Sequence, residues 1–420
     1  MVQVGRSAER DQNAIRETFI RLFSFIIEKQ NFNTVLLFLS VTIADLQPLF
    51  WYKMILMTRC LILVIGLQLL SFICPAQPPA IIAYYAGPAH RVDSFEVEKL
   101  THVIYSFCHL KGNRLNVDDA GDTLTIQKLV QLKARNPNLK VLLSLGGWGG
   151  CKMCSEVFST PQGRDEFSAS VKELTDYFKT DGIDLDWEYP AISGYPGHRF
   201  GPEDKPNFTA LVISLRKALG KRHEISFAAG GFTTFLQKSI EWDKVMPVVD
   251  YVNLMTYDLV HGYSTLTGHH TPLYSTASQV ESTDNAVRYL DSIGVPKNKM
   301  VIGAAFYARV FENVADVNNG LYQTAKFRKG VPHRNFERTF SRDSGFAYHW
   351  DPVAKAPWLY NADKKWFVTF DDTSSIRLKM EYTIDRKLRG IMFWQLNEDK
   401  LRNGLLHVLY ETRQKHFKKK

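Results

Sequence analysis

The sequence lacks the strong charge that would indicate a polyanionic partner. Only 23% of its 420 residues are charged, and 52 lysines and arginines oppose 43 aspartates and glutamates, for a net charge of +9. Most of this excess is terminal, because residues 1–79 carry +2 and the last ten residues +4, which leaves +3 for the remainder. The body of the protein is therefore nearly neutral, and the sequence predicts no nucleic-acid partner.

Long apolar segments are also missing, and a mean hydropathy of −0.19 excludes a polytopic membrane protein. The apolar run from Cys60 to Cys74 is shorter than the about 20 residues that span a membrane, and it follows Lys53 and Arg59. This pattern predicts a signal peptide at 54–76 and a secreted protein without membrane attachment once the signal is removed. A retained anchor and a buried core helix are the alternatives.

Signal peptides normally begin a chain, so a signal that starts at residue 54 is unusual. Met54 and Met57 lie where an initiator residue would be expected. We therefore expect 1–53 to be an extension from a misassigned start. The alternative is an amphipathic helical segment that folds.

Cysteine is scarce, with five residues in the chain. Cys60 and Cys74 belong to the predicted signal, which leaves Cys108, Cys151 and Cys154. A single Cys-x-x-Cys pair is weak evidence for zinc, which takes four ligands, and in an exported protein an oxidised pair is favoured over a metal. The sequence predicts neither a metal nor a cofactor, and it leaves the pairing of these three cysteines open.

Aromatic residues, in contrast, make up 13% of the chain, which excludes wholesale disorder. From residue 80 onward, runs rich in β-branched and aromatic residues alternate with stretches of helical spacing. Alternating strands and helices predict an α/β fold, and eight such units close a (β/α)₈ TIM barrel, here over 77–410. The predicted strands are 80–85, 102–107, 140–145, 182–187, 224–229, 251–257, 300–307 and 390–394.

Two further segments depart from the barrel pattern. Residues 310–366 are too long for an unstructured loop and contain glycines, prolines and many aromatics, so we expect a small α+β insertion between the seventh strand and the last helices. Residues 411–420 form a basic C-terminal tail, and we expect its end, Lys418-Lys419-Lys420, to be solvated and frayed. An anchor for an acidic surface is the alternative for this tail.

Acidic residues alternate along the fourth predicted strand. Asp184, Asp186 and Glu188 share one face of a strand, while Ile183, Leu185 and Trp187 share the other. If the apolar set packs under the helices, the acids point into the barrel, and their mutual repulsion requires at least one to be protonated or hydrogen-bonded. The pattern predicts Glu188 as a general acid with a raised pKa. A salt-bridged or metal-binding cluster is the alternative.

With Asp181, these acids form a DxxDxDxE pattern that resembles the signature of family 18 glycoside hydrolases, the chitinases and their relatives. Ser144-Leu-Gly146-Gly147 resembles the SxGG motif of that family, and Met255-Thr-Tyr257-Asp258 resembles its MxYD motif. The resemblance covers about 80–410, and it extends to two further positions, Arg309 on the seventh strand and Trp394 on the eighth.

The resemblance implies a mechanism in which the acetamido group of the substrate attacks the anomeric carbon, so that no protein nucleophile is needed. Glu188 would protonate the glycosidic oxygen and then activate water. Asp186 would bind the acetamido N–H, Asp184 would share a proton with Asp186, and Tyr257 would align the acetamido oxygen. Ser144 and Asp181 would have supporting roles.

The resemblance also implies which residues contact the sugar. Asp258 and Arg309 would bind hydroxyls, and the alternative is that they form only a salt bridge with each other. For Tyr84 and Phe107, the alternative to a sugar contact is a place in the hydrophobic core. Pro88 and Tyr263 stand where many relatives place a tryptophan, which predicts fewer distal sugar contacts. The implied contacts are Trp394, Tyr84, Phe107, Gly147, Trp148, Tyr189, Met255, Asp258 and Arg309.

The resemblance therefore implies a chitinase that cleaves β-1,4-linked N-acetylglucosamine polymers with retention. We expect a monomer whose partner is chitin or a chitooligosaccharide. An endo-β-N-acetylglucosaminidase acting on N-glycans is one alternative. A chitin-binding lectin is another, although such relatives typically replace the terminal glutamate, and Glu188 is present here.

Overall fold

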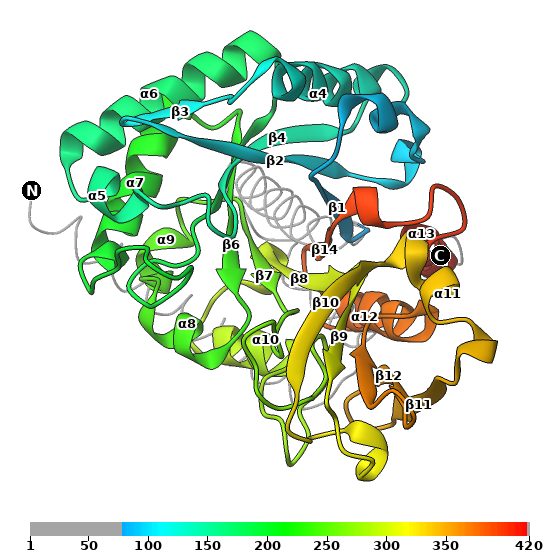
Figure 1. The fold of residues 1–420 in the computed structure, drawn as a ribbon. Coiled ribbons are helices and arrows are strands. Elements are labelled where there is room, and N and C mark those ends of the chain that lie inside the picture. The colour runs from blue at the N-terminus through cyan, green and yellow to red at the C-terminus, as the bar shows by residue number, and fades with distance from the viewer. Residues whose placement is uncertain (1–77, 418–420) are drawn as a thin grey trace, which may run out of the picture. The chain divides into compact units, whose positions relative to one another are not determined.

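The computed structural model describes residues 78–417 (Figure 1). The predicted extension at 1–53 and the predicted signal peptide at 54–76 lie outside this range. None of the helices between 78 and 417 is both long enough and apolar enough to span a bilayer.

Eight parallel strands form a closed barrel, because β1 pairs with both β14 and β2. This confirms the predicted (β/α)₈ fold. Around the ring the order is β1, β14, β8, β7, β6, β5, β4 and β2, which places β5 directly opposite β14. The strands are β1 (Ala80–Tyr85), β2 (His102–Lys111), β4 (Lys140–Gly146), β5 (Gly182–Asp186), β6 (Glu224–Gly230), β7 (Tyr251–Met255), β8 (Met300–Ala305) and β14 (Gly390–Trp394).

The seventh predicted strand, 300–307, is two strands in the structure. β8 ends at Ala305, and β9 (Tyr307–Glu312) begins a second sheet. Between them, the Phe306 backbone N–H donates to the Trp394 carbonyl at 2.8 Å, while its own carbonyl accepts from His333 N–H at 2.9 Å. These bonds turn the chain out of the barrel at Phe306.

The helices that surround the barrel begin with ordinary capping chemistry. Helix α6 has Thr160 as its N-cap, whose side chain accepts from the Gly163 N–H, and Pro161 in its first turn. Helix α12 begins with a capping box made by Asp372 and Ser375. The helices are α4 (Ala120–Gln131), α5 (Cys154–Phe158), α6 (Pro161–Phe178), α7 (Asp204–Leu219), α8 (Thr233–Lys238), α9 (Trp242–Val245), α10 (Thr283–Ser292), α11 (Phe336–Thr339), α12 (Thr373–Asp385) and α13 (Leu405–Phe417).

Short elements lie in the connections. Strand β3 (Arg114–Asn116) pairs with β2 outside the barrel. The 3₁₀ turns are η1 (Ala89–Ser94), η2 (Val97–Lys99), η3 (Leu132–Ala134), η4 (Lys297–Lys299), η5 (Asn318–Gly320), η6 (His333–Asn335), η7 (Arg342–Ser344) and η8 (Leu396–Glu398).

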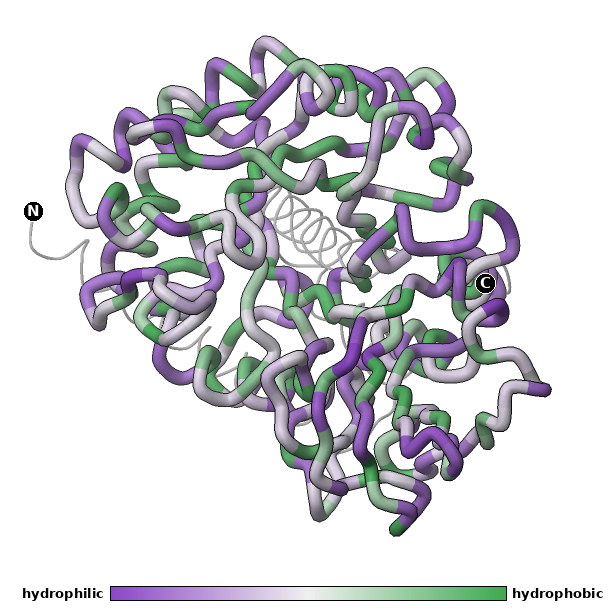
Figure 2. The backbone as a smooth tube through the Cα atoms, in the orientation of Figure 1, coloured by the Kyte–Doolittle hydropathy of each residue, from purple (hydrophilic) through white to green (hydrophobic). Residues whose placement is uncertain are grey.

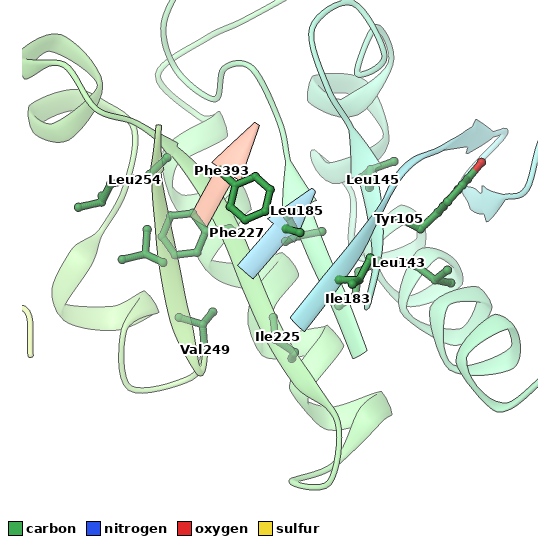
Figure 3. Packing of buried hydrophobic residues seen from close by; sticks show 14 of the residues in the cluster. Tyr105, Leu143, Leu145, Ile183, Leu185, Ile225, Phe227, Val249, Leu254 and Phe393 are labelled. Carbon is green, nitrogen blue, oxygen red and sulfur yellow. The ribbon is translucent and has the colours of Figure 1, made fainter. Parts of the chain in front are cut away.

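The hydrophobic core has two parts, one on each face of the barrel wall. The outer part lies between strands and helices and includes Ile183, Leu185 and Trp187 of the β5 segment (Figure 3). The inner part fills the barrel and includes Ile82, Ile104 and Met392. Figure 2 shows hydrophobic stretches along the strands, whereas the outer helices alternate between hydrophobic and hydrophilic positions. The alternation along β5 therefore directs its acids inward, as the sequence predicted.

The second sheet has five antiparallel strands in the order β10, β9, β13, β12, β11. It extends from Tyr307 to Thr369, three residues beyond each end of the predicted insertion at 310–366. Asp371 fastens its exit to the barrel by accepting from the Ala305 N–H at 3.0 Å and pairing with the buried Lys379 at 2.6 Å. Its strands besides β9 are β10 (Lys326–Pro332), β11 (Ala347–Asp351), β12 (Ala356–Asn361) and β13 (Trp366–Thr369).

The basic segment at 411–420 is not frayed over the residues that the structure describes. Helix α13 continues to Phe417, because Leu405, Leu406 and Leu409 bury its inner face. Arg413 is only 9% exposed and donates to the Pro79 carbonyl at 3.1 Å. The expected frayed end at 418–420 lies outside the described residues.

Candidate active site

Asp184 lies at the centre of a complete hydrogen-bond network inside the barrel. Its Oδ2 accepts from Tyr84 at 3.0 Å and from Ser144 at 2.9 Å, and its Oδ1 accepts from Ser226 at 2.6 Å and from Asn253 at 3.2 Å. Burial raises the pKa of Asp184, and these four donors oppose that rise because they stabilise the carboxylate.

Among the described residues, no hydrogen bond joins Asp184 to Asp186. The proton that the family resemblance places between them stays a prediction. In this conformation Asp184 accepts from four donors on neighbouring strands. Ser144 holds Asp184 alone, not the pair of carboxylates.

Asp186 is two residues nearer the carboxyl end of β5, and its environment is the opposite of that of Asp184. It is 4% exposed, and within 78–417 its buried Oδ1 has no hydrogen-bond partner. Burial raises the pKa of Asp186 well above its usual value, and the nearby charges of Glu188 and Asp184 raise it further. A buried carboxylate oxygen without a donor is costly to maintain, so this atom is available to an incoming N–H or O–H group.

Glu188 follows β5 and is half-buried. Burial raises its pKa to about 7; the Tyr189 hydroxyl lowers this pKa, and the negative charge of Asp258 raises it. A carboxyl group with this pKa holds its proton near neutral pH and can still release it, which is the property a general acid requires.

Tyr257 offers a hydroxyl close to these carboxyl groups. It is 9% exposed, and its only hydrogen bond within the described chain is a weak one to the Met392 sulfur at 3.8 Å. Burial and the charge of Asp186 raise its pKa well above the usual value, so the hydroxyl remains a proton donor. Met255 packs in the same interior cluster.

Asp258 and Arg309 form a bidentate ion pair, with the Arg309 Nε 2.7 Å from Oδ1 of Asp258 and its Nη2 on Oδ2. His270 approaches Asp258 from behind, with Nδ1 3.5 Å from Oδ1. Burial alone would raise the pKa of Asp258, but His270 and Arg309 lower it well below its usual range. The salt bridge considered from the sequence is therefore present, and sugar contacts by its members stay a prediction.

Gly146 and Gly147 carry the chain past the site in conformations that suit glycine, with φ of +108° and +79°. A Cβ on Gly146 would lie 2.2 Å from the Asp186 carbonyl oxygen, and one on Gly147 2.3 Å from the Phe107 ring. A disulfide joins Cys151 to Cys154 directly after this turn, and Cys108 is free and buried. The glycines therefore allow the β4 end to approach both Asp186 and Phe107.

Aromatic rings surround the carboxyl groups at two depths. Trp394 and Phe107 are half-buried and stack with centroids 5.5 Å apart at 13°. Tyr84 is 1% exposed and its hydroxyl is bonded to Asp184, so it cannot offer a surface for sugar. The predicted sugar contact of Tyr84 is corrected to a positioning role, because an inward side chain at this level of the strand lies below the rim.

A second aromatic group lies at the end of β4. Trp148 is 47% exposed, with centroids 6.4 Å from Tyr189, 5.6 Å from Tyr195 and 6.2 Å from Tyr263. Tyr189 also packs against Phe232 and Phe235. We call Trp148, Tyr195 and Tyr263 the aromatic surface. Tyr195 was not expected from the sequence, since no periodic pattern marks its loop.

Asp181 lies at the other end of β5, away from the acids. It accepts from the Val141 N–H at 2.7 Å and pairs with Lys133 at 2.6 Å. Its supporting role is therefore to join β5 to β4 at the amino end of the barrel.

Sequence reasoning missed Ser226 and Asn253, which complete the network around Asp184. Both are 0% exposed polar residues at inward positions of apolar strands, and that interruption is the signal that could have identified them. It also missed Glu398, whose pKa burial raises to about 7. Across 78–417, no group of three or more His, Cys, Asp or Glu side chains is arranged to hold a metal ion.

Comparisons with known proteins agree with this geometry. The model of "Glycosyl hydrolases family 18" matches residues 80–399. Chitinase A1 of Niallia circulans is 34% identical over 312 residues, which cover 67% of this chain and 44% of that protein. Chitotriosidase-1 of Mus musculus is 30% identical over 326 residues, covering 71% of this chain and 67% of that protein.

Solved structures also match. A family 18 N-acetylglucosaminidase from Paenibacillus barengoltzii superposes with a TM-score of 0.73 and 35% identity, covering 80% of this chain and 99% of that one. The family match spans all eight barrel strands and includes every acidic residue of the β5 segment. The chain is therefore a glycoside hydrolase and belongs to glycosyl hydrolase family 18.

Proposed function

We propose that the protein is a chitinase that hydrolyses β-1,4-linked N-acetylglucosamine polymers with retention of configuration. The names of its relatives, Chitinase A1 and Chitotriosidase-1, support this substrate class. A nearly neutral body with exposed aromatic rings suits an uncharged polysaccharide, whose pyranose rings present apolar faces.

The observation that carries the mechanism is the grouping of three side chains: Asp186, whose Oδ1 has no partner within the described chain, Tyr257, whose hydroxyl contacts only the Met392 sulfur there, and the acid Glu188. An acetamido group supplies what the first two lack, because its N–H donates to Asp186 and its carbonyl oxygen accepts from Tyr257. Donation to Asp186 favours the charged form of that carboxyl, so the proton remains on Glu188.

In the first step, Glu188 transfers its proton to the glycosidic oxygen and the bond from that oxygen to the anomeric carbon breaks. The acetamido carbonyl oxygen attacks the same carbon and forms an oxazolinium ring, so the electron pair comes from the substrate. Tyr257 orients the attacking oxygen, and Asp186 stabilises the positive charge that develops.

In the second step, the Glu188 carboxylate removes a proton from water while the water oxygen attacks the anomeric carbon. The ring opens, the acetamido group is restored, and Glu188 is again protonated. Two inversions at one carbon give retention. Ser144, Ser226, Asn253 and Tyr84 hold Asp184, and their proposed role is to keep β5 in position.

Hydrolysis of fluorogenic chitobiose and chitotriose tests the proposal. Glu188→Gln should lower kcat by about 10³-fold while chitooligosaccharide binding persists, because the amide keeps the shape of the acid but cannot donate a proton. Glu173→Gln, an exposed glutamate, is the matched control. Wild-type protein without turnover, together with equal oligosaccharide binding by Glu188→Gln, would contradict the enzyme assignment.

We also propose that the protein is exported and acts as a monomer in solution. The Cys151–Cys154 disulfide supports export, since such bonds persist in oxidising compartments. N-terminal sequencing of exported protein tests this, because a mature chain that retains residues before 54 would contradict the predicted signal. Light scattering would measure the oligomeric state.

A further inference from the structure

The carboxyl end of the barrel has two different sides. The aromatic surface gathers around Trp148, which follows β4, the neighbour of the acid-bearing strand β5, with Tyr195 from the connection after β5 and Tyr263 from the connection after β7. Trp394 ends β14, directly opposite β5 in the ring. Beyond Trp394 lie three polar residues that the proposed mechanism does not use: Arg334 in η6, and Asn397 and Glu398 in η8.

These three residues carry solvent-shielded polar atoms without partners. Nη1 of Arg334, Oδ1 of Asn397 and Oε2 of Glu398 have no hydrogen bond within the described chain. Buried polar atoms of this kind are rare in native proteins and indicate that a partner is missing. A donor and two acceptors together match the hydroxyl groups of a sugar, which both donate and accept.

The three residues come from segments that meet on this side. Asn397 Nδ2 donates to the Ala86 carbonyl at 3.3 Å, and the Ala86 N–H donates to Gln395 at 2.9 Å, so η8 is held against the end of β1. η8 begins two residues after Trp394, and His333, the neighbour of Arg334, lies 2.9 Å from Asp399, the neighbour of Glu398. The cluster is therefore close to the candidate active site.

Two contacts join the segment around η6 to the loop that follows η8. His333 Nδ1 lies 2.9 Å from Asp399 Oδ1, and Lys400 Nζ lies 2.6 Å from Glu337 Oε1. These contacts hold the inserted segment against the loop after η8 on the side where Arg334 and Glu398 lie.

The direction of the substrate follows from the position of Glu188. The released half of the substrate lies beyond the oxygen that Glu188 protonates. The ring centroid of Tyr189, the residue after Glu188, is 6.4 Å from that of Trp148, so we place that half toward the aromatic surface. The other half, which contains the non-reducing end, lies toward Arg334, Asn397 and Glu398.

We propose that Arg334, Asn397 and Glu398 bind hydroxyl groups of the terminal sugar at the non-reducing end, so that the protein removes short fragments of fixed size from chain ends. This proposal rests on the proposed function. Burial also raises the pKa of Glu398 to about 7, which lets its carboxyl group donate as well as accept near neutral pH.

Cleavage of chitohexaose labelled at its reducing end tests this proposal. The wild type should release one labelled product first, shortened by a fixed number of sugars. Arg334→Met and Glu398→Gln should give several labelled products in the first tenth of the reaction, because the end is no longer held. Arg338→Met and Glu381→Gln, which change exposed residues, should behave as the wild type does.

Calorimetric binding of chitotetraose in the Glu188→Gln background provides a readout that needs no turnover. Arg334→Met and Glu398→Gln should each weaken affinity by about tenfold, as expected for one lost hydrogen bond to a charged group. Several early labelled products from the wild type, or unchanged affinity in both variants, overturn the end-binding proposal while the chitinase assignment stands. A wild type that cleaves no substrate overturns both.

Discussion

The interior of the barrel holds two layers of polar side chains that differ in how completely they are bonded. In the lower layer, Asp184 accepts from four donors. In the upper layer, which consists of Asp186, Glu188 and Tyr257, one carboxylate oxygen has no partner and the tyrosine hydroxyl has only a sulfur. Two carboxylates only two residues apart on β5 thus have opposite surroundings.

This difference separates structural from chemical roles. A buried acid with all its donors in place fixes neighbouring strands and gains little from a ligand. A buried acid without donors destabilises the empty site and is stabilised when a ligand supplies them. We therefore expect substrate to bind at the layer with unsatisfied polar atoms and not at the most buried acid.

Removing the Asp186 carboxylate, which lacks a hydrogen-bond donor, should have the largest effect on kcat. Asp186→Asn should lower kcat by about 10²- to 10³-fold with little change in KM, because the charge acts mainly on the intermediate. Steady-state kinetics with fluorogenic chitotriose would measure both constants. Asp316→Asn, an exposed aspartate of the inserted segment, is the control. A rise in KM alone would place Asp186 in ground-state binding instead.

Tyr257→Phe should have the next largest effect. Loss of the hydroxyl removes one oriented donor from the acetamido oxygen and should lower kcat by about 10²-fold. The thermal midpoint should hardly change, since the hydroxyl makes only a weak contact with Met392. A large fall in the thermal midpoint would show that the Tyr257 hydroxyl is fully hydrogen-bonded, as the residues of the lower layer are.

The upper layer should also determine the pH dependence. Because the pKa of Glu188 is about 7 and its protonated form is active, kcat/KM should fall about tenfold per pH unit above 7. A profile of kcat/KM between pH 4 and 9 measures this limb. A limb that begins near pH 4.5 would mean that burial does not raise this pKa.

The raised pKa of Glu188 also makes the free energy of unfolding depend on pH in a definite direction. Between the unfolded pKa of a glutamate, about 4.3, and the folded value, the native state binds more protons than the unfolded state. The contribution of Glu188 to stability therefore falls as the pH rises through this window. Glu188→Gln should flatten the decline of the thermal midpoint between pH 5 and pH 8.

A substitution in the lower layer, around Asp184, should have the smallest effect on kcat and a clear effect on the free energy of unfolding. Ser226→Ala removes one donor from Asp184 and should lower the free energy of unfolding by about 1–3 kcal/mol. We expect kcat to stay within about tenfold of the wild type. Chemical denaturation would measure the free energy of unfolding, and steady-state kinetics on the same preparation would measure kcat. Ser214→Ala on an outer helix is the control.

Much of the barrel was predictable, because strand periodicity is local. The inward direction of Asp184 and Asp186 follows from the period of two along β5, and the ends of β1 and β14 agree with the prediction to the residue. The end of β8 was harder, since the apolar run continues into β9 and only the backbone bonds of Phe306 separate them.

Contacts between distant segments were not predictable in the same way. Tyr84 and Asp184 are 100 residues apart, and only the closed barrel brings the tyrosine hydroxyl to that carboxylate. His333 and Asp399, which are 66 residues apart, come within 2.9 Å through the docking of the insertion on the loop after η8, which no local pattern records. The sequence predicts the reacting residues by motif, whereas the assignment of each to a layer needs the folded chain.

The attachment of the five-stranded sheet to the barrel limits how this fold can be recombined. Asp371 bonds to Ala305 of β8, to Ser375 of α12 and to Thr271 of the long connection after β7, and Lys379 neutralises it from within the core. A graft of residues 307–369 alone into another barrel would leave Asp371 and Lys379 behind as an anchor without its sheet. A graft of the sheet into another barrel therefore has to include Thr271, Asp371 and Lys379 together with it.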